Sequence, residues 1–392
     1  MATVDNAHPA TDVALTRRAR ALVETGTTDL APAVLPVPLD YYRDPALHAR
    51  ERSEVLAHVP LALVESARIP QSHDYVVREV LGTSVLLTRD GDGRAHALLN
   101  YCRHRGARPA QGCGSARRFT CPYHAWTYDS GGRLVGLPGQ EGFAEIDRSR
   151  YGLVELPCEE RHGFVWAVLT AGDPIDVAAH LGPLDAELGS WGFAGYEHLE
   201  ERTFDAEVNW KSALEAFAES YHFPYVHGAS IVGMNTVANT AAFDTFGPDH
   251  PHHRLAFPCP WITGLPDDAP PLDGMALIYW IYPHLVLGVS PVGVEVIDIL
   301  PGDDPGTCRL RHGWMAVEPA GDDEARRTGY RALFDAVHSA VVDEDFGVLP
   351  SCTDAIRHAQ HDHMLVGRNE PAVQNVVRAF TTALGLALDL WS

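Results

Sequence analysis

Basic residues are scarce in this 392-residue chain, and only one of them, Lys211, is a lysine. Thirty lysines and arginines stand against 52 acidic residues, which gives a formal net charge of −22 at pH 7. A surface of this charge repels phosphate groups. The composition therefore argues against nucleic acid or an anionic membrane as a partner.

Long apolar runs are also missing, since no stretch approaches the roughly 18 residues that a membrane-spanning helix needs. The first residues, Met1-Ala2-Thr3-Val4-Asp5, have neither the basic nor the apolar region of a secretory signal. Seven cysteines at irregular spacing do not give the pattern of a disulfide framework. We therefore expect a cytoplasmic protein without a membrane span.

The length is sufficient for two domains with separate cores. The first half is rich in short β segments, and the second half alternates longer strands with helices. We expect strands over 75–80, 85–89, 95–99, 127–129, 133–135, 163–169 and 309–317, two strands within 275–300, and helices over 12–24, 44–57, 207–221, 324–342 and 371–388. This order predicts an α+β protein, with a small antiparallel β domain followed by an antiparallel sheet covered by helices.

Two pairs of metal-binding side chains lie close together in the first half: Cys102-x-His104 and Cys121-x-x-His124. In a Rieske [2Fe–2S] centre one iron takes two cysteines and the other takes two histidines, so each pair can supply one ligand to each iron. A structural zinc site is the alternative, but its ligands more often follow the order C-x-x-C and then H-x-x-x-H. We therefore predict a Rieske cluster.

Arginines surround these pairs, and residues 101–124 contain no acidic side chain: Arg103, Arg105, Arg108, Arg117 and Arg118. A basic face on an acidic protein is suited to docking an acidic electron donor. The same arginines could instead offset the negative charge of the cluster or have a packing role. Both interpretations stay open from the sequence.

A second group of ligand candidates lies between residues 209 and 227. On a continuous helix Glu215, Glu219 and His222 would fall within about 60° of one another. Pro224 then ends the helix, so that His227 can return towards the same point. Two imidazoles and one carboxylate form the facial triad of non-haem Fe(II) oxygenases. The third ligand has to come from elsewhere in the fold.

Both segments resemble the Rieske non-haem iron oxygenases, the ring-hydroxylating oxygenase α-subunit family. The resemblance rests on Cys102-Arg-His-Arg-Gly-Ala107, Cys121-Pro-Tyr-His-Ala-Trp126 and Asn209-Trp-Lys, continuing to His222 and His227, and it covers roughly residues 40–390. The chain departs from the family pattern at Ala125, where glycine is usual, at Ala216, where asparagine is usual, and at Glu219, where many members have aspartate. None of these changes removes a ligand.

The resemblance implies an N-terminal extension over 1–40 that packs on the catalytic domain, a Rieske domain over 41–170 and a START/SRPBCC-like catalytic domain over 171–392. It also implies that the third iron ligand is an aspartate after the long helix. Asp345 is the best match, and Asp343 and Asp354 are the alternatives.

The family also implies roles around the iron. Glu219 corresponds to the acid that links the first iron histidine to the Rieske histidine of a neighbouring subunit. Asn209 either approaches the iron as a catalytic residue or caps its helix, and Glu215 could pair with Lys211 one turn away. The candidates for the substrate pocket are Phe217, Phe223, Val226, Met234 and Val286.

These features predict a terminal oxygenase with a Rieske cluster, a mononuclear Fe(II) and O2 as co-substrate. Its electrons would come from NAD(P)H through a reductase or ferredoxin. The resemblance implies a homotrimer and a small, aromatic or cyclic organic substrate, which is dihydroxylated, monohydroxylated or demethylated. The alternative is a Rieske electron carrier or redox sensor whose C-terminal domain only binds a ligand.

Overall fold

The computed structural model describes residues 12–386, which form two compact units. The larger unit contains the chain up to Val55, Leu181–Gly192 and the chain from Tyr196 onward, and the smaller unit contains Leu56–His180 and Phe193–Gly195. The first boundary therefore follows Val55 instead of residue 40. The reason is that α2 (Leu39–Arg43) packs against α11 (Phe346–His358) of the larger unit.

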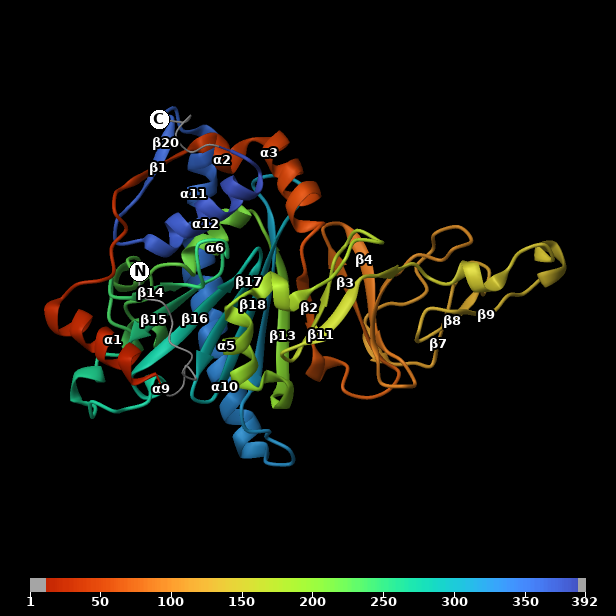
Figure 1. Cartoon of the computed structure of the whole chain (residues 1–392), viewed down its shortest axis with the longest axis horizontal. Helices are drawn as coiled ribbons and strands as arrows, with labels where there is room; N and C mark the ends of the chain where they lie inside the picture. The colour runs from red at the N-terminus through yellow and green to blue at the C-terminus, as the bar shows by residue number, and fades with distance from the viewer. Residues whose placement is uncertain (1–11, 387–392) are drawn as a thin grey trace. The chain divides into compact units, whose positions relative to one another are not determined.

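A seven-stranded antiparallel sheet forms the centre of the larger unit, in the order β13-β19-β18-β17-β16-β15-β14 (Figure 1). Its strands are β13 (Glu197–Ala206), β14 (Ala242–Thr245), β15 (His253–Pro258), β16 (Met275–Ile281), β17 (Leu285–Ser290), β18 (Gly293–Pro301) and β19 (Cys308–Ala316). Residues 275–300 thus hold three strands where two were predicted, because the chain turns before Leu285 as well as after Ser290.

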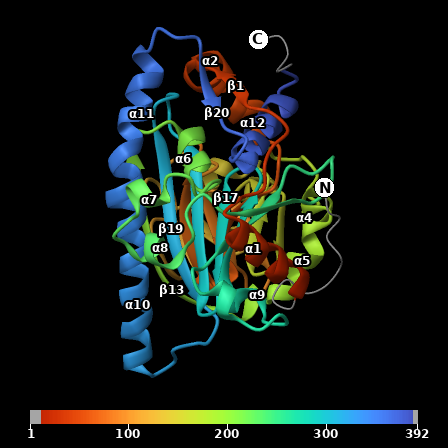
Figure 2. The same ribbon diagram turned by 90° about the vertical axis from the view of Figure 1, so that its left-hand side faces the viewer.

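Helices and one short strand pair accompany this sheet. They are α1 (Val13–Thr25), α3 (Pro45–Arg50), the π-helix Glu51–Leu56, α5 (Leu184–Trp191), α6 (Trp210–Ala216), α7 (Phe223–Val226), α8 (Ile231–Asn235), α9 (Pro271–Gly274), α10 (Glu324–Ser339), the π-helix Ala340–Asp345, α12 (Pro371–Ala383), and the pair β1 (Leu35–Pro38) and β20 (His363–Val366). Figure 2 shows α10 and α11 following one another beside the sheet, and α10 contacts β13 and β19.

Several helix ends agree with sequence signals. Asp12, Asp44 and Asp323 each accept a backbone N–H in the first turn of α1, α3 and α10, and Pro45 occupies the first position of α3. The helix predicted over 371–388 ends at Ala383, and residues 387 and 388 lie outside the described part.

The smaller unit consists of short antiparallel strands in three sheets, with the orders β10-β5-β4-β3-β6, β11-β12-β2 and β7-β8-β9. The strands are β2 (Leu61–Glu65), β3 (Asp74–Val80), β4 (Thr83–Arg89), β5 (Ala95–Leu99), β6 (Cys113–Ser115), β7 (Arg118–Thr120), β8 (Thr127–Asp129), β9 (Leu134–Gly136), β10 (Glu155–Leu156), β11 (Cys158–Arg161) and β12 (Phe164–Ala167). Its short helical segments are Ser66–Arg68, Gln140–Phe143, Arg148–Tyr151, Phe193–Gly195 and α4 (Val177–Leu181), which ends at the unit boundary.

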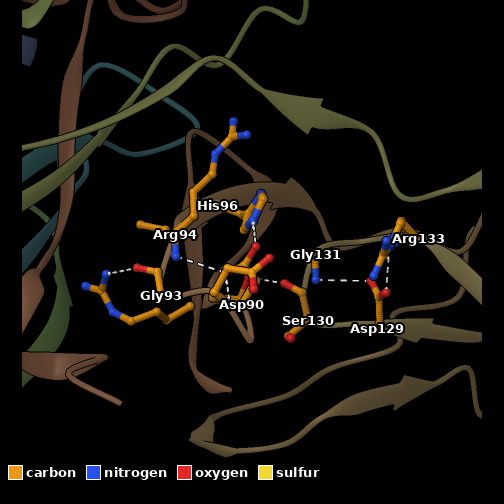
Figure 3. Close-up of polar contacts among 12 residues, drawn as sticks. Asp90, Gly93, Arg94, His96, Asp129, Ser130, Gly131 and Arg133 are labelled. Atoms are coloured by element: carbon orange, nitrogen blue, oxygen red, sulfur yellow. Dashed lines mark hydrogen bonds and ion pairs between the residues drawn. The ribbon is translucent and has the colours of Figure 1, made fainter. Parts of the chain in front are cut away.

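Two aspartates stabilise the hairpin turns of this unit (Figure 3). Asp90 accepts the backbone N–H groups of Asp92 and Arg94 after β4, and Asp129 accepts those of Gly131 and Arg133 after β8. Aspartate side chains favour turns through such bonds to the following backbone. The hairpins in turn hold the two loops that carry the Cys-His pairs.

Within residues 12–386, no helix combines the length and the apolar character that a bilayer crossing requires.

Candidate metal centres and active site

The two Cys-His loops of the smaller unit have the same backbone design. Cys102 N–H donates to Ala107 O while Gly106 N–H donates back to Cys102 O, and the second loop repeats this between Cys121, Trp126 and Ala125. Each turn needs a left-handed residue four positions after its cysteine. Gly106 has φ 78° and Ala125 has φ 57°. Glycine adopts this conformation freely, whereas alanine does so with strain.

The four side chains of these loops suit a cluster with buried thiolates and accessible imidazoles. Cys102 and Cys121 are buried and in no disulfide, whereas His124 is exposed. The rings of His104 and His124 lie 4.5 Å apart between centroids. Nδ1 of His104 is buried and has no hydrogen-bond partner among the described residues. A ring nitrogen that serves as a metal ligand is in this state when the metal is not bound.

A single tetrahedral ion fits these four residues less well. Within the described chain, one group of three or more such side chains has its ligand atoms within 4.8 Å of one another, and that group is His222, His227 and Asp345. The Cys and His ligand atoms of the smaller unit are therefore more widely spread. This spread is what a two-iron cluster requires, because its ligands divide between two metals.

The surroundings of Cys102 are polar on one side. The hydroxyl of Tyr128 accepts the backbone N–H of Arg103 and lies 3.2 Å from Sγ of Cys102, to which it can donate. Hydrogen bonds to the sulfurs of a cluster tune its reduction potential. The indole of Trp126 stacks on His104 with centroids 5.2 Å apart and fixes the imidazole plane.

All five arginines near the loops are exposed. Arg108 is paired with Glu79 at 2.7 Å, and Arg103 donates to the carbonyl of Gly152. Two of the five therefore have structural contacts, while their guanidinium groups still contribute to a basic face.

The second site lies in the larger unit, where the two ends of α7 meet the end of the π-helix Ala340–Asp345. His222 precedes α7 and His227 follows it, so that the four-residue helix containing Pro224 turns both imidazoles in one direction. Asp345 is the last residue of the π-helix that continues α10. The alternatives Asp343 and Asp354 point elsewhere, since Asp343 accepts from Ser339 and Asp354 is exposed beside His358.

The ligand atoms form a nearly equilateral triangle. Nε2 of His222 and Nε2 of His227 are 3.1 Å apart, and Oδ1 of Asp345 lies 3.4 Å from the first and 3.0 Å from the second. Ligand atoms on one face of an octahedron, each about 2.1 Å from the metal, are separated by about 3 Å. The residues therefore fit a metal ion held by a facial triad.

The electrostatics of the triad favour a cation. Burial opposes the charged form of His222, but hydrogen bonds to Asp345 and Glu219 outweigh this effect and raise its pKa to about 9. Burial acts in the opposite sense on Asp345, yet its bonds to the two histidines keep its pKa below the ordinary value. A divalent metal would replace the protons that this site otherwise holds.

Each metal-facing imidazole is oriented from behind by a glutamate. Oε1 of Glu219 bonds to Nδ1 of His222, and Oε2 of Glu344 lies 2.6 Å from Nδ1 of His227. Such partners fix the tautomer that presents Nε2 to a metal. Glu344 was not predicted, although its position next to Asp345 in the acidic run 343–345 was a signal that could have identified it.

The predicted continuous helix over 207–221 is wrong, since α6 ends at Ala216 and Phe217 is its C-cap. Glu215 is therefore not on one face with Glu219 and His222. It is partly buried and accepts the hydroxyl of Tyr42, and desolvation raises its pKa to about 8. Lys211 pairs with Glu51 in place of the predicted Glu215.

Asn209 caps α6, which is one of the two roles predicted for it. Its Oδ1 accepts the N–H groups of Lys211 and Ser212, and its Nδ2 donates to the carbonyls of Tyr42 and Pro305. All four hydrogen-bonding positions of the amide are thus occupied. The residue is also buried, and it does not line the cavity described next.

A cavity of about 370 Å³ opens beside the triad, and His222, His227 and Asp345 form part of its wall. Most of the remaining wall is apolar and comes from α8, α10 and strands β16 to β19. Of the predicted pocket residues, Phe217 and Phe223 line it, whereas Val226, Met234 and Val286 do not. Met234 is 63% exposed, and Val286 is buried in β17 at 2%.

Two family models match the chain. One is described as the ring hydroxylating alpha subunit (catalytic domain) and matches residues 193–385, and the other is described as the Rieske [2Fe-2S] domain and matches residues 60–149. The chain belongs to the Rieske oxygenase family. The predicted family, fold class and cofactors are thereby confirmed, because these two domains imply a Rieske cluster and a mononuclear iron.

The relatives of this chain have diverse names. The glycine betaine monooxygenase oxygenase subunit of Chromohalobacter salexigens is 30% identical over 192 residues, which are 49% of this chain and 43% of that protein. The biphenyl 2,3-dioxygenase subunit alpha of Rhodococcus jostii is 30% identical over 196 residues, covering 46% and 41%. The chain thus spans about half the length of the curated relatives it matches.

Solved structures extend the likeness of the fold over nearly the whole chain. A quaternary ammonium Rieske monooxygenase in complex with L-carnitine has a TM-score of 0.73 at 18% identity, covering 98% of this chain and 99% of that one. Naphthalene 1,2-dioxygenase from a Rhodococcus species has a TM-score of 0.71 at 17% identity, covering 97% and 98%.

Proposed function

We propose that this Rieske oxygenase is the terminal component of an oxygenase system that hydroxylates or demethylates a small organic substrate with O2. The observation that carries the proposal is the facial arrangement of His222, His227 and Asp345 in the wall of a cavity large enough for a small molecule. An electron carrier would have no need for this combination.

Two sets of residues hold the metals in this proposal. Cys102, His104, Cys121 and His124 hold the [2Fe–2S] cluster, and His222, His227 and Asp345 hold the mononuclear iron. When bound, the cluster supplies single electrons and the mononuclear iron supplies the open positions at which dioxygen is activated.

The surrounding residues position these ligands and shape the cavity. Glu219 and Glu344 hold the two imidazoles with Nε2 towards the metal and balance positive charge there. The apolar wall, including Phe217 and Phe223, limits water around the reacting centre and leaves the substrate in reach of the triad.

Electrons reach the protein from NAD(P)H through a separate reductase or ferredoxin, and the exposed arginines around the Cys-His loops offer a surface of the required charge. Glu219 links the iron to the Rieske histidine of a neighbouring subunit in a homotrimer. The bond from Glu219 to Nδ1 of His222 supports the half of this link that lies within one chain. The cytoplasmic location stays a prediction.

The relatives set the range of reactions. They include proteins named as a monooxygenase, a dioxygenase and an N-demethylase, so cis-dihydroxylation, monohydroxylation and demethylation are all within the range of this architecture. An aromatic or cyclic substrate is consistent with the aromatic side chains of the wall, Phe217, Phe223 and Phe257 among them.

The variant His222→Ala tests the proposal against the electron-carrier alternative. It should lose the mononuclear iron and at least a hundredfold of substrate-dependent oxygen uptake, while the visible spectrum of the reduced cluster stays unchanged. His358→Ala is the matched control, since this histidine is 74% exposed and lies outside both sites. Unchanged oxygen uptake, or loss of the cluster spectrum, would contradict the assignment of two sites.

A further inference from the structure

One carboxylate in the cavity wall has no part in the triad. Glu295 lies on β18, and its side chain is 19% exposed within a wall that is otherwise mainly apolar. Glu219 and Asp345, the other acids of the wall, are both bonded to His222 or His227. Among the described residues that line the cavity there is no lysine or arginine.

The neighbours of Glu295 leave one oxygen available to a ligand. Oε1 lies 2.7 Å from Nε2 of His312, which is fully buried, although the contact is off the direction of an ideal hydrogen bond. Oε2 lies over Gly288, where a Cβ atom would come within 3.1 Å of it. The missing side chain at this position of β17 thus makes room for the carboxylate inside the cavity.

A second histidine, His338, lies behind His312 on the side away from Glu295. Nδ1 of His312 and Nδ1 of His338 are 2.9 Å apart, so one of them donates and the other accepts. Burial and the neighbouring His312 and Arg202 lower the pKa of His338 to about 4, which makes it neutral at pH 7. His338 therefore adds no positive charge beside His312, and Nε2 of His312 faces the carboxylate of Glu295.

Aromatic side chains line the same cavity, and one of them lies next to Glu295. Trp314 is the cross-strand partner of Glu295 on β19, and directly opposite residues of an antiparallel pair lie on one face. The indole lies over Gly293, and its N–H is buried without a hydrogen-bond partner among the described residues. Phe217, Phe223 and Trp261 line the cavity as well. Aromatic faces attract cations, and a carboxylate does so more strongly.

We propose that Glu295 determines substrate specificity, and that together with Trp314 it selects a substrate with a cationic nitrogen, an amine or ammonium group, on an apolar body. This inference rests on the proposed function, because it assigns a substrate class to the same cavity. It also predicts that carboxylic acids are poor ligands, since no basic side chain of the described wall would pair with them.

Binding to the metal-loaded protein tests the proposal by isothermal titration calorimetry without reductant, so that no turnover occurs. The probes are benzyltrimethylammonium, its uncharged carbon isostere neopentylbenzene, and phenylacetate. The unmodified protein should bind the cation at least about tenfold more tightly than phenylacetate. Equal or tighter binding of phenylacetate, or no detectable binding of the cation, would overturn the proposal without any variant.

The variant Glu295→Gln isolates the carboxylate. It should weaken binding of benzyltrimethylammonium by about tenfold or more and change that of neopentylbenzene by less than about twofold. Glu295→Asp should retain most of the preference, and Glu318→Gln, at an acid whose side chain is 74% exposed, should have no effect. If Glu295→Gln affects cation and isostere alike, or neither, the proposal fails. If the unmodified protein showed no substrate-dependent oxygen uptake, the proposed function would fail instead. The two failures are therefore distinguishable.

Discussion

At the scale of single residues, the proposed iron ligands depend on the acids behind them. Glu344 lies 2.6 Å from Nδ1 of His227, and this contact holds the imidazole with Nε2 towards His222 and Asp345. A carboxylate at this position also makes the imidazole a stronger ligand. Two adjacent acids thus have different tasks, since Asp345 faces the metal site and Glu344 supports a ligand.

We predict that Glu344→Gln weakens iron binding at the mononuclear site by about tenfold or more and leaves the cluster intact. The amide keeps the size of the side chain but loses the charge that supports His227. Iron content after dialysis against a chelator measures the effect. The neighbouring variant Asp343→Asn, whose carboxylate accepts only from Ser339, should retain normal iron, and equal loss from both variants would refute the distinction.

The candidate metal ligands could be selected from the sequence because their spacing is local within each pair, and Asp345 was selected by resemblance. The acidic run 343–345 marked Glu344 as a candidate, but its role behind His227 depends on where the π-helix Ala340–Asp345 turns its residues. Asn209 was left between two roles: its Oδ1 caps α6, and the distant carbonyls of Tyr42 and Pro305, which the sequence does not indicate, hold its Nδ2. Long-range contacts of this kind have no signature in a single sequence.

At the scale of elements, the two Cys-His loops share a turn that places one residue in the left-handed region. Gly106 meets this demand without strain, and Ala125 does not, since its φ is 57°. A left-handed alanine costs about 1 kcal/mol relative to glycine. The second loop is therefore less stable than it would be with glycine at residue 125.

We predict that Ala125→Gly stabilises this loop by about 1 kcal/mol, and that Gly106→Ala destabilises the first loop by a similar amount. The loss expected for Gly106→Ala comes from the backbone conformation and not from a steric clash, because a Cβ at Gly106 would meet no atom within 4 Å. The urea concentration at which the cluster absorbance is lost measures both variants. A midpoint for Ala125→Gly at or below that of the unmodified protein would contradict the interpretation.

Elements with strong periodicity or clear caps were predictable, as α1, α3, α10 and β19 show. The helix over 207–221 was overextended because its residues favour helix throughout, whereas α6 ends at Ala216 with Phe217 as its C-cap. Residues 217–222 instead bend so that Oε1 of Glu219 bonds to Nδ1 of His222. This departure from regular structure is what forms the site, and local propensity does not contain it.

At the scale of the whole molecule, the sequence predicted two domains and both metals, but not the boundary after Val55 or the wall of the cavity. Glu295, Gly288 and Trp314 come together only through the register of β17, β18 and β19. That register is set by packing across the sheet. The acidic surface and the basic face around the Cys-His loops, by contrast, follow from composition alone.

The central claim is that one chain holds a Rieske cluster and a separate mononuclear iron. Iron and acid-labile sulfide counts, combined with EPR spectra of the dithionite-reduced protein, test it most directly. We predict three irons and two sulfides per chain, with a Rieske signal that survives loss of one iron in His222→Ala. Two irons and two sulfides after full reconstitution, or zinc without sulfide, would contradict the claim.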